Sequence, residues 1–305
     1  MGRLPPRRRP FLFYDKRMSS LWKSTAATLE MIKWEHSIFA LPFALTGAVL
    51  AAGGWPAWRV LVLIVACMVT ARSAAMAFNR LADATLDAAN PRTKMRAIPA
   101  GALGRGFVGG FVVAMVVAFI VCCALLNRRT LELSPVVLLV VLGYSYMKRV
   151  SRWSHVVLGL ALGMAPSAAW IAVRGGLDPR ILVLTAAVLL WVAGFDVLYA
   201  CQDFAHDRAV GLFSVPAAFG MKTAFTIARV MHVGAIVLMV FLIKIFALGL
   251  TAWVGLAVVA GLLVYEHAIV SPTDLRRMNA AFFTLNGVIA VVFFLAFAGD
   301  VLLRR

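Results

Sequence analysis

The sequence predicts an all-α membrane protein that crosses the bilayer about nine times, with its N-terminus on the cytoplasmic side. Hydrophobic residues make up 63% of the 305 residues and charged residues only 14%, against about 45–50% and about 25% in soluble domains. Apolar runs of the length that crosses a hydrocarbon core about 30 Å thick recur along the chain. Lys and Arg gather in alternate segments between these runs, as the positive-inside rule expects.

The apolar runs follow one another along the whole chain, separated by charged or turn-forming residues. Glycine and proline, which interrupt helices, mark turns at residues 53–56, 175–176 and 271–272. The fourth run is the shortest. The predicted spans are residues 36–54, 58–80, 106–126, 134–147, 154–173, 180–201, 223–248, 250–269 and 279–300.

The distribution of basic residues sets the orientation of these spans. With the N-terminus inside, the inside segments hold twenty Lys and Arg and the outside segments seven, which favours a cytoplasmic N-terminus. Residues 1–30 form a basic tail whose Arg7, Arg8 and Arg9 can contact anionic membrane lipid, and residues 31–305 form one membrane domain. The tail lacks a signal-peptide pattern. We expect a multi-pass protein of the bacterial cytoplasmic (inner) membrane.

Composition also excludes two other classes. A net charge of +17 is typical of nucleic-acid-binding proteins, but those proteins do not carry long uncharged apolar runs, so we expect no nucleic-acid partner. The four cysteines lie inside apolar stretches and form no C-x-x-C pair. Structural zinc and a disulfide framework are therefore not expected.

The few acidic residues are concentrated near two predicted helix ends. Five of the 13 Asp and Glu residues fall in residues 79–87 and 196–207. A spacing of four residues places side chains on one face of a helix; the residues so spaced are Asn79, Asp83 and Asp87 in the first window and Tyr199, Asp203 and Asp207 in the second. Both windows lie at the end of an even-numbered span, which is the inside end. We therefore expect four carboxylates at one depth of the membrane.

Four carboxylates at one depth repel one another unless cations neutralise them. Mg²⁺ prefers carboxylate oxygens and completes its shell with water and substrate phosphates. Basic residues that suit the remaining phosphate oxygens follow the first window and occupy another inside loop: Arg92, Lys94, Arg96, Lys148 and Arg149. A single carboxylate at a helix end is as often merely interfacial. The two matched pairs, however, predict a diphosphate site in a membrane wall.

At these windows the sequence resembles the UbiA-type intramembrane aromatic prenyltransferases, the family that includes 4-hydroxybenzoate polyprenyltransferase of quinone biosynthesis. The family motif N-x-x-x-D-x-x-x-D, followed by a basic stretch and a P-x-G turn, matches residues 79–101. The second motif, Y-x-x-x-D-x-x-x-D-x-x-x-G-x-x-S, matches residues 199–214. Between them, residues 144–149 resemble the family's aromatic and Lys-Arg segment. The match spans nearly the whole chain.

The resemblance implies nine helices around a central cavity, two Mg²⁺ ions, a polyprenyl diphosphate and an aromatic acid acceptor. The implied catalytic and metal-binding residues are Asp83, Asp87, Asp203 and Asp207, with Asn79 as a further metal and substrate ligand. The implied substrate-binding residues are Lys94, Arg96, Lys148, Arg149 and Tyr199, together with Lys33, which would meet the acceptor's carboxylate. Metal ions and basic groups would stabilise the departing diphosphate, and an electron-rich ring would attack the allylic cation. Asp196 is a candidate base for the ring proton.

The acceptor is less determined than the reaction. Many ubiquinone-branch enzymes carry Asp where this chain has Arg80, and Ala97 replaces the usual proline after Arg96. The leading acceptor is 4-hydroxybenzoate, for ubiquinone synthesis, and the alternative is 1,4-dihydroxy-6-naphthoate, for menaquinone synthesis. A haem-type or chlorophyll-type prenyltransferase has less support. From another class, a cation-coupled transporter also uses intramembrane carboxylates, but the chain shows no clear internal repeat.

Overall fold

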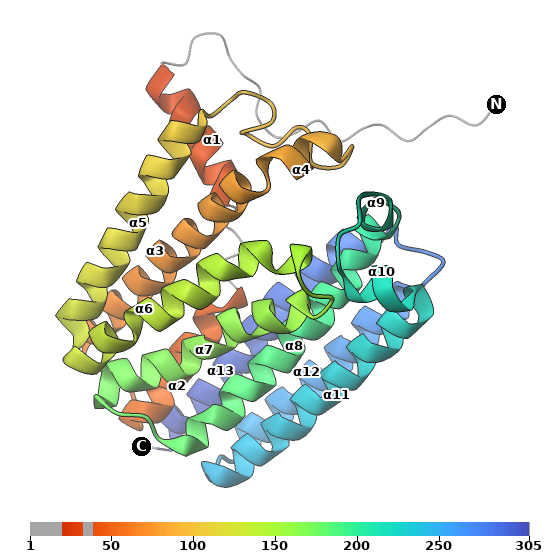
Figure 1. Ribbon diagram of the computed structural model, residues 1–305. Coiled ribbons are helices and arrows are strands. Elements are labelled where there is room, and N and C mark those ends of the chain that lie inside the picture. Colours follow the sequence, from red (N-terminus) through yellow and green to blue (C-terminus); the bar gives the residue numbers. More distant parts are fainter. Residues whose placement is uncertain (1–19, 33–38, 305) are drawn as a thin grey trace.

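The computed structural model describes residues 20–32 and 39–304, which form a helical bundle (Figure 1). The described part contains no β-strand longer than a single bridge, between Ser271 and Asp274. Its α-helices are α1 (Ser20–Ile32), α2 (Leu41–Ala52), α3 (Trp58–Ala82), α4 (Ala84–Ala89), α5 (Arg105–Leu126), α6 (Arg128–Gly143), α7 (Ser154–Arg174), α8 (Leu182–Ala200), α9 (Phe204–Val210), α10 (Val215–Phe219), α11 (Met221–Ile245), α12 (Leu250–Ile269) and α13 (Asn286–Leu303). Four other helical turns join them: η2 (Tyr144–Arg149), η3 (Pro179–Ile181) and η4 (Cys201–Asp203), which are 3-10 turns, and η5 (Ala280–Leu285), a π-helix.

Eight helices within the described ranges are long and apolar enough to cross a membrane. The predicted class, an all-α polytopic membrane protein, is therefore confirmed. The predicted number of nine membrane spans is not confirmed. The first predicted span, 36–54, contains only the 12-residue α2, and residues 33–38 lie outside the described part. The ninth span and the cytoplasmic N-terminus stay predictions.

The predicted start of the fourth span, residue 134, was wrong by six residues. Helix α6 begins at Arg128, and together with η2 it makes one run of 22 residues, Arg128–Arg149. The charged side chains of its first turn are tolerated because Arg128 and Arg129 both pair with Glu132. Asn127 caps this helix, because its side-chain oxygen accepts the Thr130 backbone N–H at 2.9 Å.

Consecutive helices pack against one another around the bundle, and α13 returns to α2 (Figure 1). Helix α8 lies at the centre and buries most of its length, including Trp191, whose ring packs 5.0 Å from that of Phe43 on α2. Helices α7 and α8 approach closely at Gly159 and Gly163, where an added Cβ would lie 2.4 Å and 2.8 Å from backbone oxygens of α8. Small residues four apart allow such backbone contact in membrane bundles.

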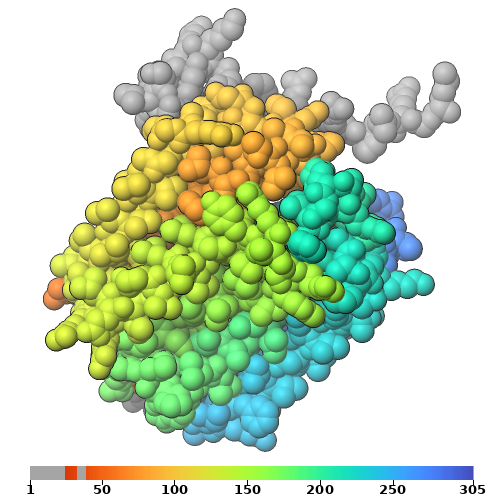
Figure 2. Space-filling view, in the orientation of Figure 1, coloured from red at the N-terminus to blue at the C-terminus, as the bar shows by residue number. Residues whose placement is uncertain are grey.

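The two motif windows lie at the same end of this bundle. The first leads from α3 into α4 and the second from α8 into α9, and Figure 2 shows these two segments, orange and teal, at one end of the molecule. The predicted common depth of the two windows follows from this arrangement. Because α3 and α8 both end here, their last side chains can face one shared cavity.

Candidate active site

The first motif interrupts its helix rather than continuing it. Helix α3 ends at Ala82, and Asp83 has φ −96° and ψ 9° before α4 begins. This bridge-region backbone is typical of helix ends and of active-site residues. The amide Nδ2 of Asn79 still donates to Asp83 Oδ2 at 3.1 Å. The expectation that Asn79, Asp83 and Asp87 share one continuous helical face was therefore wrong at the break, because Asp87 belongs to a second, short helix.

Both carboxylates of the first motif are held by guanidinium groups from other segments. Arg149, at the end of η2, donates to Asp83 Oδ1 at 2.8 Å and to the backbone oxygen of Ala82 at 2.7 Å. Arg96 donates through Nη1 to both oxygens of Asp87, at 2.6 Å and 2.8 Å. Asp87 is buried, and this pairing gives both of its carboxylate oxygens a hydrogen-bond donor.

The second motif repeats the same backbone change. Helix α8 ends at Ala200, the 3-10 turn η4 follows, and Asp203 has φ −98° and ψ 5° before α9. Asp207 lies in the first turn of α9, as Asp87 does in α4. Gly211, with φ 72°, ends α9 in the left-handed conformation that glycine adopts without strain. Each motif thus consists of a helix end, a break and a short second helix.

Arg92 joins the two motifs across the cavity. It leaves the loop after the first motif and binds Asp203 through two bonds, Nε to Oδ1 at 2.8 Å and Nη2 to Oδ2 at 2.6 Å. Its guanidinium also lies 5.7 Å from the centre of the Tyr199 ring. Partial burial disfavours the charge of Arg92, but the Asp203 carboxylate outweighs this and raises the pKa of the guanidinium. Asn90 reaches the same carboxylate at 3.5 Å.

Asp207 differs from the other three aspartates because no guanidinium holds it. It is 2% exposed, and its Oδ2 has no hydrogen-bond partner in the described part of the chain. Lys148 lies close enough to attract the carboxylates of both Asp203 and Asp207. The backbone oxygen of Lys148 accepts the Phe213 N–H at 2.8 Å, which ties η2 to the loop after the second motif. A buried carboxylate oxygen without a partner suits a cationic ligand.

These groups line one cavity of about 1210 Å³. Most of the predicted site residues line it: Asn79, Asp83, Asp87, Arg96, Lys148, Arg149, Tyr199, Asp203 and Asp207. Lys94 is exposed and does not line the cavity. Lys33 lies outside the described residues. Beyond the aspartates the cavity wall becomes apolar, with Phe119, Leu126, Leu133 and Val137 among its residues.

The donor set fits Mg²⁺. No group of three or more His, Cys, Asp and Glu side chains in the described part is arranged as a complete protein cage for a metal. Mg²⁺ does not require such a cage, because it is usually held by one or two carboxylates together with water and substrate phosphates. The cavity offers two such carboxylate pairs, and Asp207 Oδ2 in the second pair is buried without a partner.

An aromatic cluster covers the second-motif side of the cavity. Phe282 lies 4.1 Å from the Tyr199 ring and 5.1 Å from that of Phe195, and Phe283 lies 5.8 Å from Tyr199, centre to centre. Both phenylalanines belong to the π-helix η5, which presents adjacent residues to the same cluster. Asn286 fixes this turn, because its Nδ2 donates to the backbone oxygen of Ala281 at 3.1 Å.

Asn286 is itself held from the neighbouring helix. Its Nδ2 also donates to Glu266 Oε1 of α12 at 3.0 Å, and both side chains are buried. A π-turn inside a helix often marks a functional position. The pair of Glu266 and Asn286 therefore supports the turn from outside the cavity.

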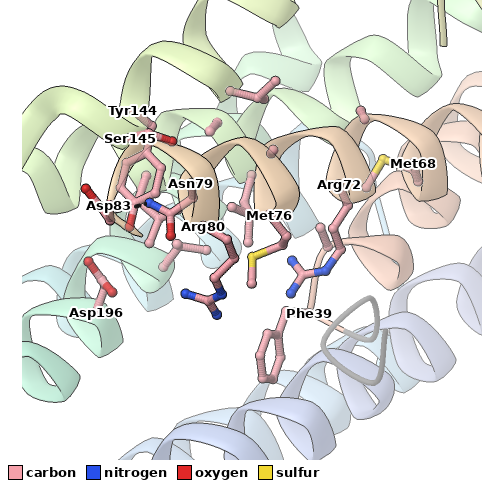
Figure 3. Close-up of a pocket in the computed structure, with 18 of the residues that line it drawn as sticks. Phe39, Met68, Arg72, Met76, Asn79, Arg80, Asp83, Tyr144, Ser145 and Asp196 are labelled. Atoms are coloured by element: carbon pink, nitrogen blue, oxygen red, sulfur yellow. Dashed lines mark hydrogen bonds between the residues drawn. The ribbon is translucent and has the colours of Figure 1, made fainter. Parts of the chain in front are cut away.

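Asp196 faces the cavity one helical turn before Tyr199 (Figure 3). His155 Nδ1 lies 2.7 Å from Asp196 Oδ2, and His155 Nε2 accepts the Val215 backbone N–H at 3.3 Å. Because Nε2 accepts, the neutral ring carries its proton on Nδ1 and donates it to Asp196. The fully buried imidazole thus fixes the orientation of this carboxylate.

Some contacts and residues of the cavity were not predicted. Arg92 was expected only as one of the basic residues that suit phosphate oxygens, and its bond to Asp203 was not predicted. Asn90 carried no signal of its own. Arg72 was visible as a charge inside a predicted span, which is a default indication of function in a membrane helix. Arg72 and Arg80 both line the cavity and point to the same side of α3 (Figure 3).

Comparisons of this chain with known proteins identify one protein family. The model of the UbiA prenyltransferase family matches residues 40–297. The chain is 31% identical over 252 residues to a 4-hydroxybenzoate octaprenyltransferase of Vibrio cholerae, which covers 83% of this chain and 88% of the relative. It is 32% identical over 258 residues to the protein of that name from Saccharophagus degradans, which covers 84% of this chain and 85% of the relative.

Solved structures resemble this one over most of their length. A UbiA homolog from Aeropyrum pernix, solved without ligand, matches with a TM-score of 0.80 and 34% identity, over 88% of this chain and 99% of the homolog. A homolog from Archaeoglobus fulgidus, solved with DMAPP and Mg²⁺, matches with a TM-score of 0.72 and 16% identity, over 91% of this chain and 99% of that one. At 16% identity, the likeness to the A. fulgidus homolog shows the shared fold alone.

Proposed function

The chain belongs to the UbiA prenyltransferase family and is a prenyltransferase, and from this premise we propose that it transfers a polyprenyl group to an aromatic carboxylic acid. The leading acceptor is 4-hydroxybenzoate and the second is 1,4-dihydroxy-6-naphthoate. The observation that carries the proposal is the bond between Arg92 and Asp203, which joins two acidic motifs across a cavity that is charged at one end and apolar beyond. That cavity suits an amphipathic donor with a diphosphate head and a prenyl tail.

The donor in this proposal is a polyprenyl diphosphate. Two structures of a UbiA homolog from A. fulgidus contain a prenyl diphosphate with Mg²⁺, DMAPP in one and GPP in the other. Here Asp83, Asp87, Asp203 and Asp207, with Asn79, would hold two Mg²⁺ ions. When bound, Mg²⁺ would neutralise the diphosphate oxygens and so make diphosphate a better leaving group.

The basic residues of the site would change partners as the donor binds. Arg92, Arg96 and Arg149 form ion pairs with three of the four aspartates. A diphosphate offers these guanidinium groups the same charge-assisted bonds. We therefore assign Arg92, Arg96, Lys148 and Arg149 to the departing diphosphate. Lys94 is exposed, and we assign it no contact with the diphosphate.

The transfer step breaks the bond between the allylic carbon and the diphosphate oxygen, and the acceptor ring forms a new carbon–carbon bond. The aromatic cluster around Phe282 and Tyr199 would exclude water from the allylic cation. The ring then loses a proton, which Asp196 would accept. The hydrogen bond from His155 holds the carboxylate toward the cavity for this purpose.

The site would open to the cytoplasm. The motif end of the bundle carries the basic residues that the positive-inside rule assigns to the cytoplasmic side, among them Arg92, Arg96, Lys148 and Arg149. We propose the bacterial inner membrane as the location. The prenyl tail would extend through the apolar part of the cavity and contact membrane lipid.

The test is a prenylation assay on the full chain reconstituted in lipid vesicles, with a polyprenyl diphosphate and Mg²⁺. Parallel reactions contain 4-hydroxybenzoate or 1,4-dihydroxy-6-naphthoate. Product from the first acceptor supports the ubiquinone-type assignment, and product from the naphthoate alone moves the protein to menaquinone synthesis. Replacing Mg²⁺ with EDTA should abolish either product.

Two variants and one matched control complete the test. Asp83→Asn and Asp203→Asn should each lower the rate at least about 100-fold, since each removes a carboxylate that would hold the Mg²⁺ needed to neutralise the leaving group. Asp178→Asn changes an aspartate in a comparable pair with Arg180, but on the exposed turn at the opposite end of the bundle, and should keep the wild-type rate. Full activity in Asp83→Asn or Asp203→Asn, or no product from either acceptor with folded protein, would contradict the proposal.

A further inference from the structure

Glu266 is an acidic residue buried in the membrane-spanning helix α12, which packs against α13 (Figure 1). It is 1% exposed, and no ion pair within the described ranges includes it. Glu266 does not line the central cavity, so Mg²⁺ held by the two motifs would not neutralise it. A carboxylate at membrane depth carries a high free-energy cost unless a cation or several donors satisfy it.

The hydrogen bonds between Glu266 and Asn286 leave two oxygens without a donor. Nδ2 of Asn286 donates to Glu266 Oε1 and to the backbone oxygen of Ala281, and these two bonds use both of its N–H groups. Glu266 Oε2 and Asn286 Oδ1 are buried and have no hydrogen-bond partner among the described residues. If Glu266 were ionised, both oxygens would be acceptors only. One added proton serves both of them.

No neighbouring cation takes the place of that proton. No charged side chain in the described part of the chain lies near enough to act on the Glu266 carboxyl group, which is influenced only by its burial and by the Asn286 bond. The charged side chains of the helices packed against α12 are exposed or paired elsewhere: Lys222, Arg229 and Lys244 of α11 are exposed, and Asp300 of α13 pairs with Arg304.

Two histidines beside Glu266 satisfy each other. His267 follows Glu266 on α12, and its Nε2 lies 3.0 Å from Nδ1 of His232 on α11. Nε2 of His232 donates to the backbone oxygen of Trp191 at 3.2 Å. Nδ1 of His232 therefore accepts from His267, and both rings are neutral in this arrangement. Neither ring supplies a positive charge to Glu266.

We propose that Glu266 is a neutral carboxylic acid, with its proton on Oε2 and donated to Asn286 Oδ1. A carboxylic acid and a primary amide can form two parallel hydrogen bonds, one from N–H to oxygen and one from O–H to oxygen. The bond from Nδ2 to Oε1 is the first of these. The second gives both unsatisfied oxygens a partner and removes the buried charge. Carboxylic acids in apolar sites of other proteins stay neutral and donate in this way.

The acid–amide pair makes Glu266 a positioning residue for the aromatic cluster. Two bonds fix the plane of the Asn286 amide, so its second N–H is directed at Ala281 inside the π-turn η5. That turn carries Phe282 and Phe283 against Tyr199. The effect on the reaction rests on the proposed function, in which this cluster excludes water from the allylic cation.

Infrared spectroscopy of the full chain in lipid vesicles tests the proton without any catalysis. The C=O stretch of a protonated carboxylic acid lies at higher frequency than the carboxylate bands. At neutral pH, the wild-type spectrum minus that of Glu266→Gln should contain one such acid band. The matched control is Glu132→Gln, because Glu132 is exposed and pairs with Arg128, so its difference spectrum should contain carboxylate bands only. Carboxylate bands in place of the acid band for Glu266 would overturn the proposal.

The share of prenyl alcohol among the reaction products tests the positioning role. Glu266→Gln offers Asn286 the same oxygen and an N–H in place of the O–H, so its alcohol share should stay within about twofold of wild type. Glu266→Met keeps the length of the side chain but removes both bonds, and should raise the share about threefold to tenfold, the range for a lost neutral hydrogen bond. An unchanged share in Glu266→Met, or an equal rise in both variants, would overturn this role. No product from the wild type would contradict the proposed function instead, since the infrared band does not depend on transfer.

Discussion

The two acidic motifs have nearly the same backbone and different electrostatics. Asp83 and Asp203 share φ near −97° and ψ near 7° at a helix break, and each is followed by a short helix with a second aspartate in its first turn. In the first motif both carboxylates are held by guanidinium groups. In the second, Arg92 holds Asp203 but no guanidinium holds Asp207. The two motifs therefore share a local backbone, and they differ in the residues that contact each carboxylate.

The largest expected effects concern the second aspartate of each motif, Asp87 in the first and Asp207 in the second. Asp87→Asn and Asp207→Asn should both lower the rate of prenyl transfer about 100-fold or more. Their effects on stability should differ. Asp87→Asn leaves Arg96 without its partner and should destabilise the protein by about 1 kcal/mol, whereas Asp207→Asn removes a buried charge that no guanidinium holds and should lower Tm less. Rates in vesicles and thermal unfolding in detergent measure the two effects. An equal loss of Tm would contradict the electrostatic difference between the motifs.

The next effect tests the link between the motifs. Arg92→Met removes the side chain that binds Asp203 and lies against Tyr199. We expect the KM for the prenyl diphosphate to rise about tenfold to 30-fold. We also expect a loss of stability of about 1–2 kcal/mol, because the buried Asp203 keeps only the long hydrogen bond from Asn90 and the attraction of Lys148. In the double variant Arg92→Met with Asp203→Asn, part of the lost stability should return. A double variant that shows the sum of the two single losses would mean that the pair does not couple.

A smaller effect tests the aromatic cluster beside the second motif. Asn286→Ala removes the donor that fixes the π-turn carrying Phe282 and Phe283. We expect about tenfold slower prenylation of the acceptor, since small displacements in a reactive site are costly, and a larger share of prenyl alcohol formed by water. The matched control is Glu266→Gln, whose amide oxygen can still accept the Asn286 N–H and should keep most activity. An unchanged ratio of alcohol to prenylated acid in Asn286→Ala would show that the turn does not protect the cation.

The smallest effect concerns the basic loop of the first motif. Lys94 is exposed and does not line the cavity, although Arg92 and Arg96 on either side of it bind the two motifs. Lys94→Ala should change kcat/KM by less than about twofold, as is usual for exposed surface substitutions. The same assay on Arg96→Met should show a loss at least ten times larger. A strong effect of Lys94→Ala would place the diphosphate differently from our proposal.

Much of the fold followed from the order of residues. Spans of apolar residues and the turns between them are local properties. The eight helices of the described part that are long and apolar enough to cross a membrane therefore agree with the predicted runs. The start of α6 could not be predicted from hydropathy, because Arg128 and Arg129 are made compatible with a helix by Glu132 one turn away. The break at Asp83 was missed for a related reason, since a spacing of four residues fits either one helix or two short ones.

The sequence by itself determined which residue types the site contains and that both motifs end helices on the same side of the membrane, because these depend on composition and periodicity. Only the tertiary structure decided which cation meets which carboxylate. Arg92 crosses from the first motif to Asp203, more than one hundred residues away, while the buried atoms Arg72 Nε and Asp207 Oδ2 have no hydrogen-bond partner among the described residues. Electrostatic interactions depend on distance and burial in space, and neither can be read from positions along the chain.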